Sequence, residues 1–202
     1  TTGAKVIISS ELVIDLAFDK IKTFNFIKQI GLLTPKTYTS LKEAKEAIKN
    51  NTLQLPLVVK PRWGSASIAV DFAENSEELD LVYKLQGLKL KKSILASASL
   101  EDINRSILIQ EKISGDEYGM DVLNNLDGDY YQSFARKKLS MRSGETDKAI
   151  SIRDENLENI GKVIGKNLRH VGNLDCDIFY DGLDFYVLEL NPRFGGGYPF
   201  SH

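Results

Sequence analysis

The chain has 202 residues, of which 42% are hydrophobic and 27% charged, with a formal net charge of -2. This is the profile of a globular protein with one large core or two small ones, and the mixed charge gives no general reason to expect nucleic acid binding. The longest apolar runs have the length of strands, too short to cross a membrane. A single cysteine, Cys176, excludes an internal disulfide framework and fits a reducing, cytoplasmic setting, while the two histidines disfavour a zinc site.

The apolar pattern predicts helices and strands in alternation. In chain order, we expect a strand at 6–8, helices at 11–30 and 41–50, strands at 57–60 and 68–72, a helix at 76–86, strands at 107–111, 119–123 and 130–138, a helix at 156–169, and a hairpin of strands 175–180 and 185–190. The segment 89–105 could be a charged loop with a helix. Because hairpins occur between the helices, the predicted class is α+β rather than a doubly wound parallel sheet.

A lysine and a run of small residues follow the strand at 57–60. Lys60 ends this strand, where its ammonium could neutralise a phosphate. Gly64, Ser65 and Ser67 come next, and small side chains let backbone N–H groups approach phosphate oxygens closely. A strand that is simply ended by Pro61 and a flexible turn explains the same residues.

The strand at 107–111 runs into a polar hinge. Such a hinge can present backbone groups to the edge of an adenine. Glu117, just beyond it, could accept hydrogen bonds from ribose hydroxyls. A surface-exposed acidic turn is the alternative interpretation.

A carboxylate and an amide are spaced for one face of the last strand. Glu189 and Asn191 are two residues apart, so both side chains point to the same side of a strand. Oxygen ligands without sulfur or imidazole are typical of a Mg²⁺ site. Pro192 stops the strand, which places Arg193 at its exit, near the same phosphates. An edge strand with solvated charges remains the alternative.

Asp177 joins this metal-facing side only if the hairpin loop has an odd length, because a slip of one residue turns every side chain to the other face. We therefore expect a three-residue loop, with Tyr180 paired to Asp184 and Asp177 opposite Val187. In that register Cys176 points into the core. An even loop would turn Asp177 away.

The order of these motifs resembles that of the ATP-grasp superfamily, and within it the proteins similar to the carbamoyl-phosphate synthase large subunit. The motifs are Phe18-Asp19-Lys20, Val59-Lys60-Pro61, Gln110-Glu111 with Glu117, and Glu189-Leu190-Asn191-Pro192-Arg193. The stretch from Asn191 to Pro199 looks like that of a stand-alone branch. The resemblance covers nearly the whole chain. It lacks the family's usual N-terminal domain before about Thr1 and whatever follows His202.

The resemblance implies an ATP-grasp fold, in which two α+β lobes clasp the nucleotide and the N-terminal pre-ATP-grasp domain is absent. Residues 1–33 would be a helical lead-in, 34–113 a small lid lobe with the phosphate loop, and 114–202 a core lobe with the metal-binding hairpin.

The resemblance also assigns roles to single residues. Lys20 and Lys60 would bind ATP phosphates together with the loop of Gly64, Ser65 and Ser67. The adenine would be held by Glu111, Lys112 and Ile113, with Glu117 on the ribose, and Mg²⁺ would be ligated by Asp177, Glu189 and Asn191. Arg193 would stabilise the transferring phosphoryl group, and Arg142 lies where relatives carry a histidine in a loop near the γ-phosphate. His170, at a helix end, is expected on the surface.

The implied function is a ligase that uses ATP and Mg²⁺, or Mn²⁺, to activate a carboxylate or bicarbonate as an acyl phosphate, which an amine or similar nucleophile then attacks. Its partners would be small carboxylate and amine substrates, with no nucleic acid and no membrane, and a homodimer stays open. Three alternatives remain: carbamoyl-phosphate synthesis itself, a non-catalytic ATP-binding module, and a structural domain without nucleotide. The acceptor substrate is not identified by the sequence.

Overall fold

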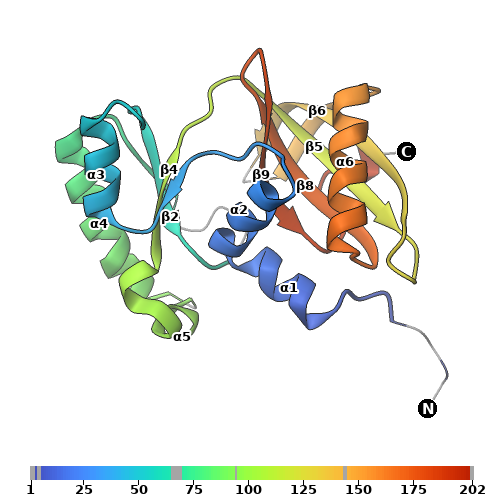
Figure 1. Ribbon diagram of the computed structural model, residues 1–202, viewed down its shortest axis with the longest axis horizontal. Helices are drawn as coiled ribbons and strands as arrows, with labels where there is room; N and C mark the ends of the chain where they lie inside the picture. Colours follow the sequence, from blue (N-terminus) through green and yellow to red (C-terminus); the bar gives the residue numbers. More distant parts are fainter. Residues whose placement is uncertain (1–2, 4–5, 65–69, 94, 143–144, 201–202) are drawn as a thin grey trace. The chain divides into compact units, whose positions relative to one another are not determined.

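The computed structural model describes residues 3, 6–64, 70–93, 95–142 and 145–200 (Figure 1). Two compact units make up the chain. The C-terminal unit consists of Thr1–Phe18, Lys22–Thr34 and Ser114–His202, and the central unit of Asp19–Ile21 and Pro35–Ile113. Asp19 and the first two residues of the helix that follows it thus belong to the same unit as a segment that begins more than a dozen residues later.

The central unit is an antiparallel sheet packed against helices. Its strand order is β1 (Thr37–Tyr38), β4 (Ile107–Glu111), β2 (Leu57–Pro61) and β3 (Asp71–Ala73). Its helices are α3 (Leu41–Lys49), α4 (Ser76–Lys91), the short α5 (Ala96–Ser99) and the 3-10 helix η1 (Leu100–Arg105). Ser40 caps α3 by accepting a hydrogen bond from the Glu43 backbone N–H, as its sequence pattern predicts.

The C-terminal unit is built on a five-stranded antiparallel sheet. Its strand order is β7 (Glu145–Ile152), β6 (Tyr130–Arg142), β5 (Asp116–Asn124), β8 (Gly172–Tyr180) and β9 (Phe185–Asn191). The helices are α1 (Glu11–Phe18), α2 (Lys20–Gln29), which begins in the central unit, and α6 (Glu155–Leu168), and a 3-10 turn η2 (Tyr198–Phe200) follows the last strand. Two antiparallel sheets with helices confirm the predicted α+β class.

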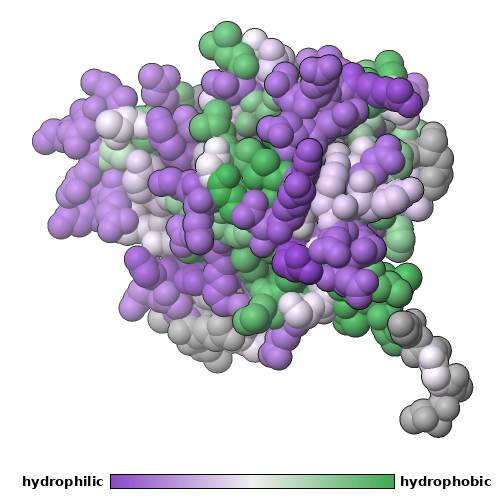
Figure 2. All heavy atoms as spheres, turned by 45° about the vertical axis from the view of Figure 1, so that its right-hand side comes forward, coloured by the Kyte–Doolittle hydropathy of each residue, from purple (hydrophilic) through white to green (hydrophobic). Residues whose placement is uncertain are grey.

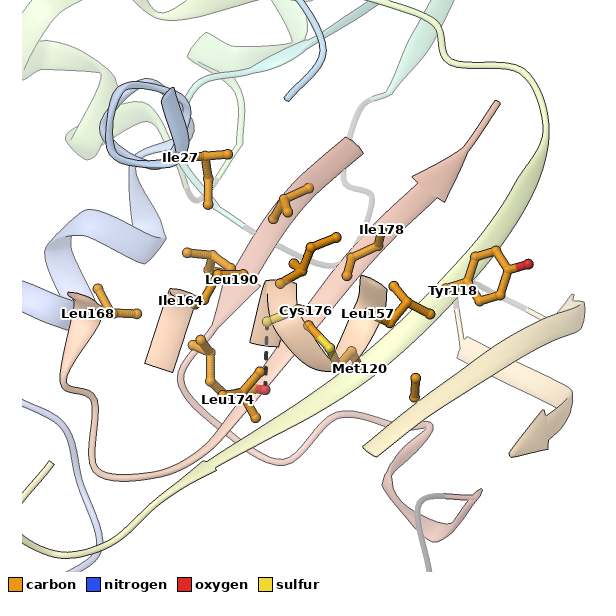
Figure 3. Packing of buried hydrophobic residues seen from close by; sticks show 14 of the residues in the cluster. Ile27, Tyr118, Met120, Leu157, Ile164, Leu168, Leu174, Cys176, Ile178 and Leu190 are labelled. Atoms are coloured by element: carbon orange, nitrogen blue, oxygen red, sulfur yellow. Dashed lines mark hydrogen bonds between the residues drawn. The ribbon is translucent and has the colours of Figure 1, made fainter. Parts of the chain in front are cut away.

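One face of the five-stranded sheet forms the apolar core, and α6 lies along it (Figure 1). Met120, Cys176 and Leu157 point toward one another between β5, β8 and the helix (Figure 3). Cys176 is fully buried, as predicted, and burial raises the pKa of its thiol. Gly161 lets α6 approach closely, because a Cβ there would lie 2.6 Å from the Ser133 Oγ.

The local pattern misplaces several elements. Residues 6–8 are not a strand, and their apolar side chains are exposed together with Leu12; Figure 2 shows apolar residues gathered beside the N-terminal end. The helix expected at 11–30 is divided at Asp19, which forms a bridge with Trp63. The segment 89–105 contains the end of α4, then α5 and η1, and β7 was not predicted.

The prediction that His170 lies on the surface is wrong. Its side chain is completely buried, and its Nε2 donates a hydrogen bond to the Val122 carbonyl oxygen at 2.9 Å. Nδ1 has no hydrogen-bond partner among the described residues. Burial disfavours the imidazolium and lowers the pKa of His170. This effect outweighs the hydrogen bond with the Val122 carbonyl, which by itself would raise the pKa. The folded protein therefore holds this ring in its neutral form.

The buried His170 predicts a pH-dependent loss of stability. Because its pKa is lowered on folding, the unfolded chain binds a proton that the folded chain does not. The free energy of unfolding should then fall as the pH drops below about 6.5. His170→Gln keeps a donor for the Val122 carbonyl but cannot titrate. Urea unfolding from about pH 7.5 to about pH 5.5 should show a steeper loss in the wild type than in the variant. Equal losses would contradict a neutral buried ring.

Candidate active site

The second face of the five-stranded sheet carries charged and amide side chains. Two rows of paired residues cross it, Arg136, Gly119, Asp177 and Glu189 in the first, and Asp121, Asp175 and Asn191 in the second. Residues that pair across antiparallel strands point to the same side of a sheet, and residues two apart share that side. The sheet thus collects polar groups from β6, β5, β8 and β9 opposite its apolar core.

Asp177 and Glu189 lie directly opposite each other, although the predicted hairpin register is wrong. Tyr180 pairs with Phe185 rather than Asp184, and Val187 lies opposite Ile178 rather than Asp177. The loop therefore has four residues, 181–184, an even number. An irregularity between Ile178 and Asp177 then shifts the pairing by one residue, so that Asp177 meets Glu189. The bulge restores the shared face that the loop alone would have removed.

Lys138 connects two of the predicted site residues. Its Nζ lies 2.6 Å from the Glu117 Oε1 and 2.6 Å from the Asp177 Oδ1, and its side chain is buried. Burial works against the ammonium, but the Asp177 and Glu117 carboxylates together outweigh it and raise the pKa of Lys138. The lysine is therefore a fixed positive charge between β6, β5 and β8. Sequence reasoning missed it, although alternation in the strand at 130–138 puts Lys138 and Arg136 on one face.

The chemistry of Asp177, Glu189 and Asn191 fits a magnesium ion. Carboxylates that face each other on neighbouring strands repel, so the pair needs positive charge nearby. Lys138 supplies it to Asp177 from one side. Asn191 lies two residues after Glu189 on β9, in register with Asp175, and adds an amide oxygen to the same face. Among the described residues no group of three or more His, Cys, Asp or Glu side chains is placed to hold a metal ion.

Arg193 and Arg142, the two predicted catalytic residues, lie at the ends of strands. Arg193 follows β9, with a half-exposed side chain whose Nη1 is 3.7 Å from the Asp175 Oδ2. Arg142 is the last residue of β6 and pairs with Glu145. Asp175 is nearly buried, and burial with the negative charge of Asp177 raises its pKa to about 6, despite the opposing charge of Arg136.

In the central unit, the structure brings Lys20 and Gly64 together. The Lys20 Nζ donates a hydrogen bond to the Gly64 carbonyl oxygen, and its backbone N–H donates to the Arg62 carbonyl. Gly64 has φ +96°, a conformation that favours glycine. Lys60 is buried in β2 opposite Leu108. The predicted phosphate-loop residues Ser65 and Ser67 lie outside the described residues.

An ion-pair cluster fixes the start of α2 against this loop. Arg62 forms two hydrogen bonds with Asp19, from Nε at 2.8 Å and from Nη2 at 2.7 Å, and a third with Asp102 at 3.2 Å. Asp19 is almost fully buried, and such bidentate pairs have a defined geometry. The cluster therefore places Lys20 beside the residues that follow β2. The sequence contains Asp19 in a recognised motif but gives no sign of its partner.

Glu111, Lys112 and Ile113 come at and after the end of β4. The Glu111 Oε2 accepts a hydrogen bond from the Lys36 backbone N–H at 3.1 Å, and the Glu111 N–H donates to the Lys36 carbonyl at 2.8 Å. The Lys112 Nζ lies 5.2 Å from the centre of the Phe72 ring. Ile113 is the last residue of the central unit. The Glu111 side chain thus holds the segment before β1.

A family model described as an ATP-grasp domain matches residues 17–197. The chain belongs to the ATP-grasp family. It is 24% identical over 201 residues to the carbamoyl phosphate synthase large chain of Clostridium acetobutylicum, which covers 95% of this chain but 18% of that protein. It is 28% identical over 124 residues to a D-alanine–D-alanine ligase of Alcanivorax borkumensis, covering 61% of this chain and 32% of the ligase. The chain therefore spans about a fifth to a third of these relatives.

Solved structures of ATP-grasp relatives share the fold. The biotin carboxylase domain of the Hydrogenobacter thermophilus 2-oxoglutarate carboxylase superposes with a TM-score of 0.78 at 19% identity, over 96% of this chain and 43% of that one. An L-amino acid ligase from Bacillus licheniformis superposes with a TM-score of 0.67 at 18% identity, over 93% of this chain and 46% of the ligase. The predicted ATP-grasp fold is confirmed. No helix in the described ranges is long and apolar enough to span a membrane.

The bridge made by Lys138 predicts a difference between two adjacent lysines. Lys138→Met keeps most of the apolar stem but leaves two partly buried carboxylates without their shared cation, so the free energy of unfolding should fall by about 1–3 kcal/mol. Lys137→Met, which removes an exposed pair with Asp116 at 2.6 Å, should lower the free energy of unfolding much less, because water screens that pair. Urea unfolding measures both. Equal losses would mean that Lys138 is no more than a surface charge.

Proposed function

We propose that the chain is the nucleotide-binding part of an ATP- and Mg²⁺-dependent ligase, which activates a carboxylate or bicarbonate as an acyl phosphate for attack by an amine or similar nucleophile. The observation that carries the proposal is the facing pair Asp177 and Glu189, with Asn191 on the same side of the sheet. Oxygen ligands in this arrangement suit a hard cation that accompanies nucleotide phosphates.

The relatives support the reaction class. Their names describe enzymes that make carbamoyl phosphate or join amino acids, and the Hydrogenobacter biotin carboxylase domain was solved with MgADP and bicarbonate. These proteins are longer than the present chain, so their activities support the proposal at the level of ATP-driven carboxylate activation.

Asp177, Glu189 and Asn191 would hold the magnesium ion in this proposal. When bound, Mg²⁺ supplies positive charge to the phosphate oxygens of ATP. Lys138 limits how Asp177 can turn, because its Nζ holds one carboxylate oxygen at 2.6 Å and leaves the other for a ligand. The same lysine orients Glu117, the residue proposed to bind the ribose.

Cationic side chains would contact the phosphates in this proposal. Lys20 and Lys60 of the central unit would bind them as predicted, with Gly64 and the residues after it. Arg193 would stabilise the charge on the transferring phosphoryl group, because a guanidinium can donate two parallel hydrogen bonds to phosphate oxygens. Arg142 is a second cation for the same charge. The backbone of Glu111, Lys112 and Ile113 would meet the adenine edge.

Carbamoyl-phosphate synthesis is the alternative within the same chemistry. The similarity to carbamoyl phosphate synthases is the reason to include the substrates of that reaction in the screen. A non-catalytic ATP-binding module is the second. Screening phosphate release with small carboxylates, amino acids and bicarbonate separates these: release that requires bicarbonate indicates the synthase reaction, release with another carboxylate indicates a different ligase, and ATP binding without any release indicates a module.

MgATP binding should depend on Lys60. Lys60→Met retains a buried apolar stem in β2 but removes the ammonium, so we expect binding to weaken by about 1.5–3 kcal/mol, or roughly 10- to 150-fold. Isothermal titration calorimetry with MgATP measures the affinity. Lys49→Met, which changes an exposed lysine on α3, is the matched control and should bind as the wild type does. Unchanged affinity in the folded Lys60 variant would remove this lysine from the site.

Turnover should depend on the metal residues. Glu189→Gln and Asn191→Ala should stay folded and lose Mg²⁺-dependent phosphate release in the substrate screen, because these side chains stand on the polar face and their removal opens no core cavity. Asp184→Asn, on the exposed loop of the same hairpin, is the control and should keep the activity. The metal assignment fails if either site variant unfolds or if release persists at the wild-type rate.

A further inference from the structure

The guanidinium of Arg136 is buried in the polar face and joins two strands. Its Nη1 donates a hydrogen bond to the Asp121 Oδ2 on β5, and its Nη2 donates to the Asp175 Oδ1 on β8 at 2.9 Å. Only 1% of the arginine side chain is exposed. Removing a charge from water costs several kcal/mol, which only close partners offset. The cluster therefore has one defined geometry, and no solvent-borne ligand touches the guanidinium directly.

Gly119 provides the path for this side chain. It lies in register between Arg136 on β6 and Asp177 on β8. A Cβ at Gly119 would be 2.8 Å from the Arg136 Cζ, closer than such atoms approach. The guanidinium can thus cross β5 above Gly119 and reach Asp175 on the next strand. Here glycine is required for space rather than for backbone conformation.

The glycine loop after β9, residues 195–197, lies directly on this cluster. A Cβ at Gly195 would be 2.2 Å from the Asp175 Oδ2, and a Cβ at Gly197 would be 2.3 Å from the Arg136 Nε. Both glycines are buried. The loop backbone therefore packs against the carboxylate and the guanidinium without room for a side chain at position 195 or 197. The nucleotide-binding roles assigned above leave these glycines unexplained.

The cluster also holds the residues just before the loop. Asn173 donates through Nδ2 to the Asp121 Oδ1 at 2.7 Å and to the Arg193 carbonyl oxygen at 3.2 Å. Asp175 pairs with Asn191 in the sheet, and its Oδ2 is 3.7 Å from the Arg193 Nη1. A displaced guanidinium would release the contacts on both sides of Arg193.

We propose that Arg136 is a positioning residue. Its guanidinium, held by hydrogen bonds to Asp121 and Asp175, packs against residues 193–197. This packing determines the positions of Arg193 and of the end of β9. The consequence for catalysis rests on the proposed function, because that function gives Arg193 and Asn191 their roles. The positioning itself does not depend on it and is tested separately.

The first experiment measures backbone amide hydrogen exchange in the wild type, Arg136→Lys and Gly197→Ala. Lysine keeps the charge but has a single nitrogen, so it cannot reproduce the fork in which Nη1 contacts Asp121 and Nη2 contacts Asp175, and alanine at position 197 pushes the guanidinium from the loop side. Both variants should exchange at least about tenfold faster in 193–197, while α6 exchanges as in the wild type. Arg153→Met, which removes an exposed arginine of the same unit, should change nothing. Wild-type exchange in the loop, or equal acceleration throughout the unit, would overturn the proposal.

The second experiment measures phosphate release by the same variants with the substrate that the screen identifies. If positioning matters, kcat should fall at least about tenfold, while the KM for MgATP changes by less than about threefold. The double variant Arg136→Lys, Gly197→Ala should have a kcat only slightly lower than either single variant, because both substitutions disturb the same contact between the guanidinium and the loop. Wild-type kcat in variants with a loosened loop would refute the catalytic consequence. Failure of the wild type to bind MgATP would instead refute the proposed function, and the exchange measurement would still decide the positioning.

Discussion

The two-residue period of the five-stranded antiparallel sheet is the constraint on which the rest of the C-terminal unit depends. In the middle of β5 and β8, alternate residues belong to the apolar core (Met120, Val122, Leu174 and Cys176), while the residues between them are charged or are glycine (Gly119, Asp121, Asp175 and Asp177). Hydrophobic burial on one face thus fixes the register for both, because a slip of one residue would turn carboxylates into the core. The candidate site is the polar half of a pattern that packing determines.

Charges on the polar face are satisfied across strands rather than along them. Lys138 joins β6 to β5 and β8, and Arg136 joins the same three strands one row further along. In the central unit, Arg62 ties Asp19 to the loop after β2 in the same way. Each cation replaces the solvation that its carboxylates lose, and Lys138 thereby holds Asp177 and Glu117, which are proposed to meet the metal and the ribose.

The sequence carried the α+β class, the order of the motifs and the shared face of Glu189 and Asn191, because each depends on local spacing. The hairpin register could not be predicted from the sequence. A four-residue loop and a bulge at Asp177 compensate for each other, and no local sequence pattern indicates either of them. Lys138 and Arg136 were missed because their importance lies in partners tens of residues away. His170 was misjudged since a helix-end position says nothing about the strand that covers it.

The central claim is that the polar face of this sheet holds the metal that accompanies ATP. A crystal structure with Mg²⁺ and a non-hydrolysable ATP analogue tests it most directly. The account predicts a magnesium ion ligated by oxygens of Asp177, Glu189 and Asn191 at about 2.0–2.1 Å and by phosphate oxygens of the analogue. An analogue bound away from these residues, or a metal ligated by others, would contradict it.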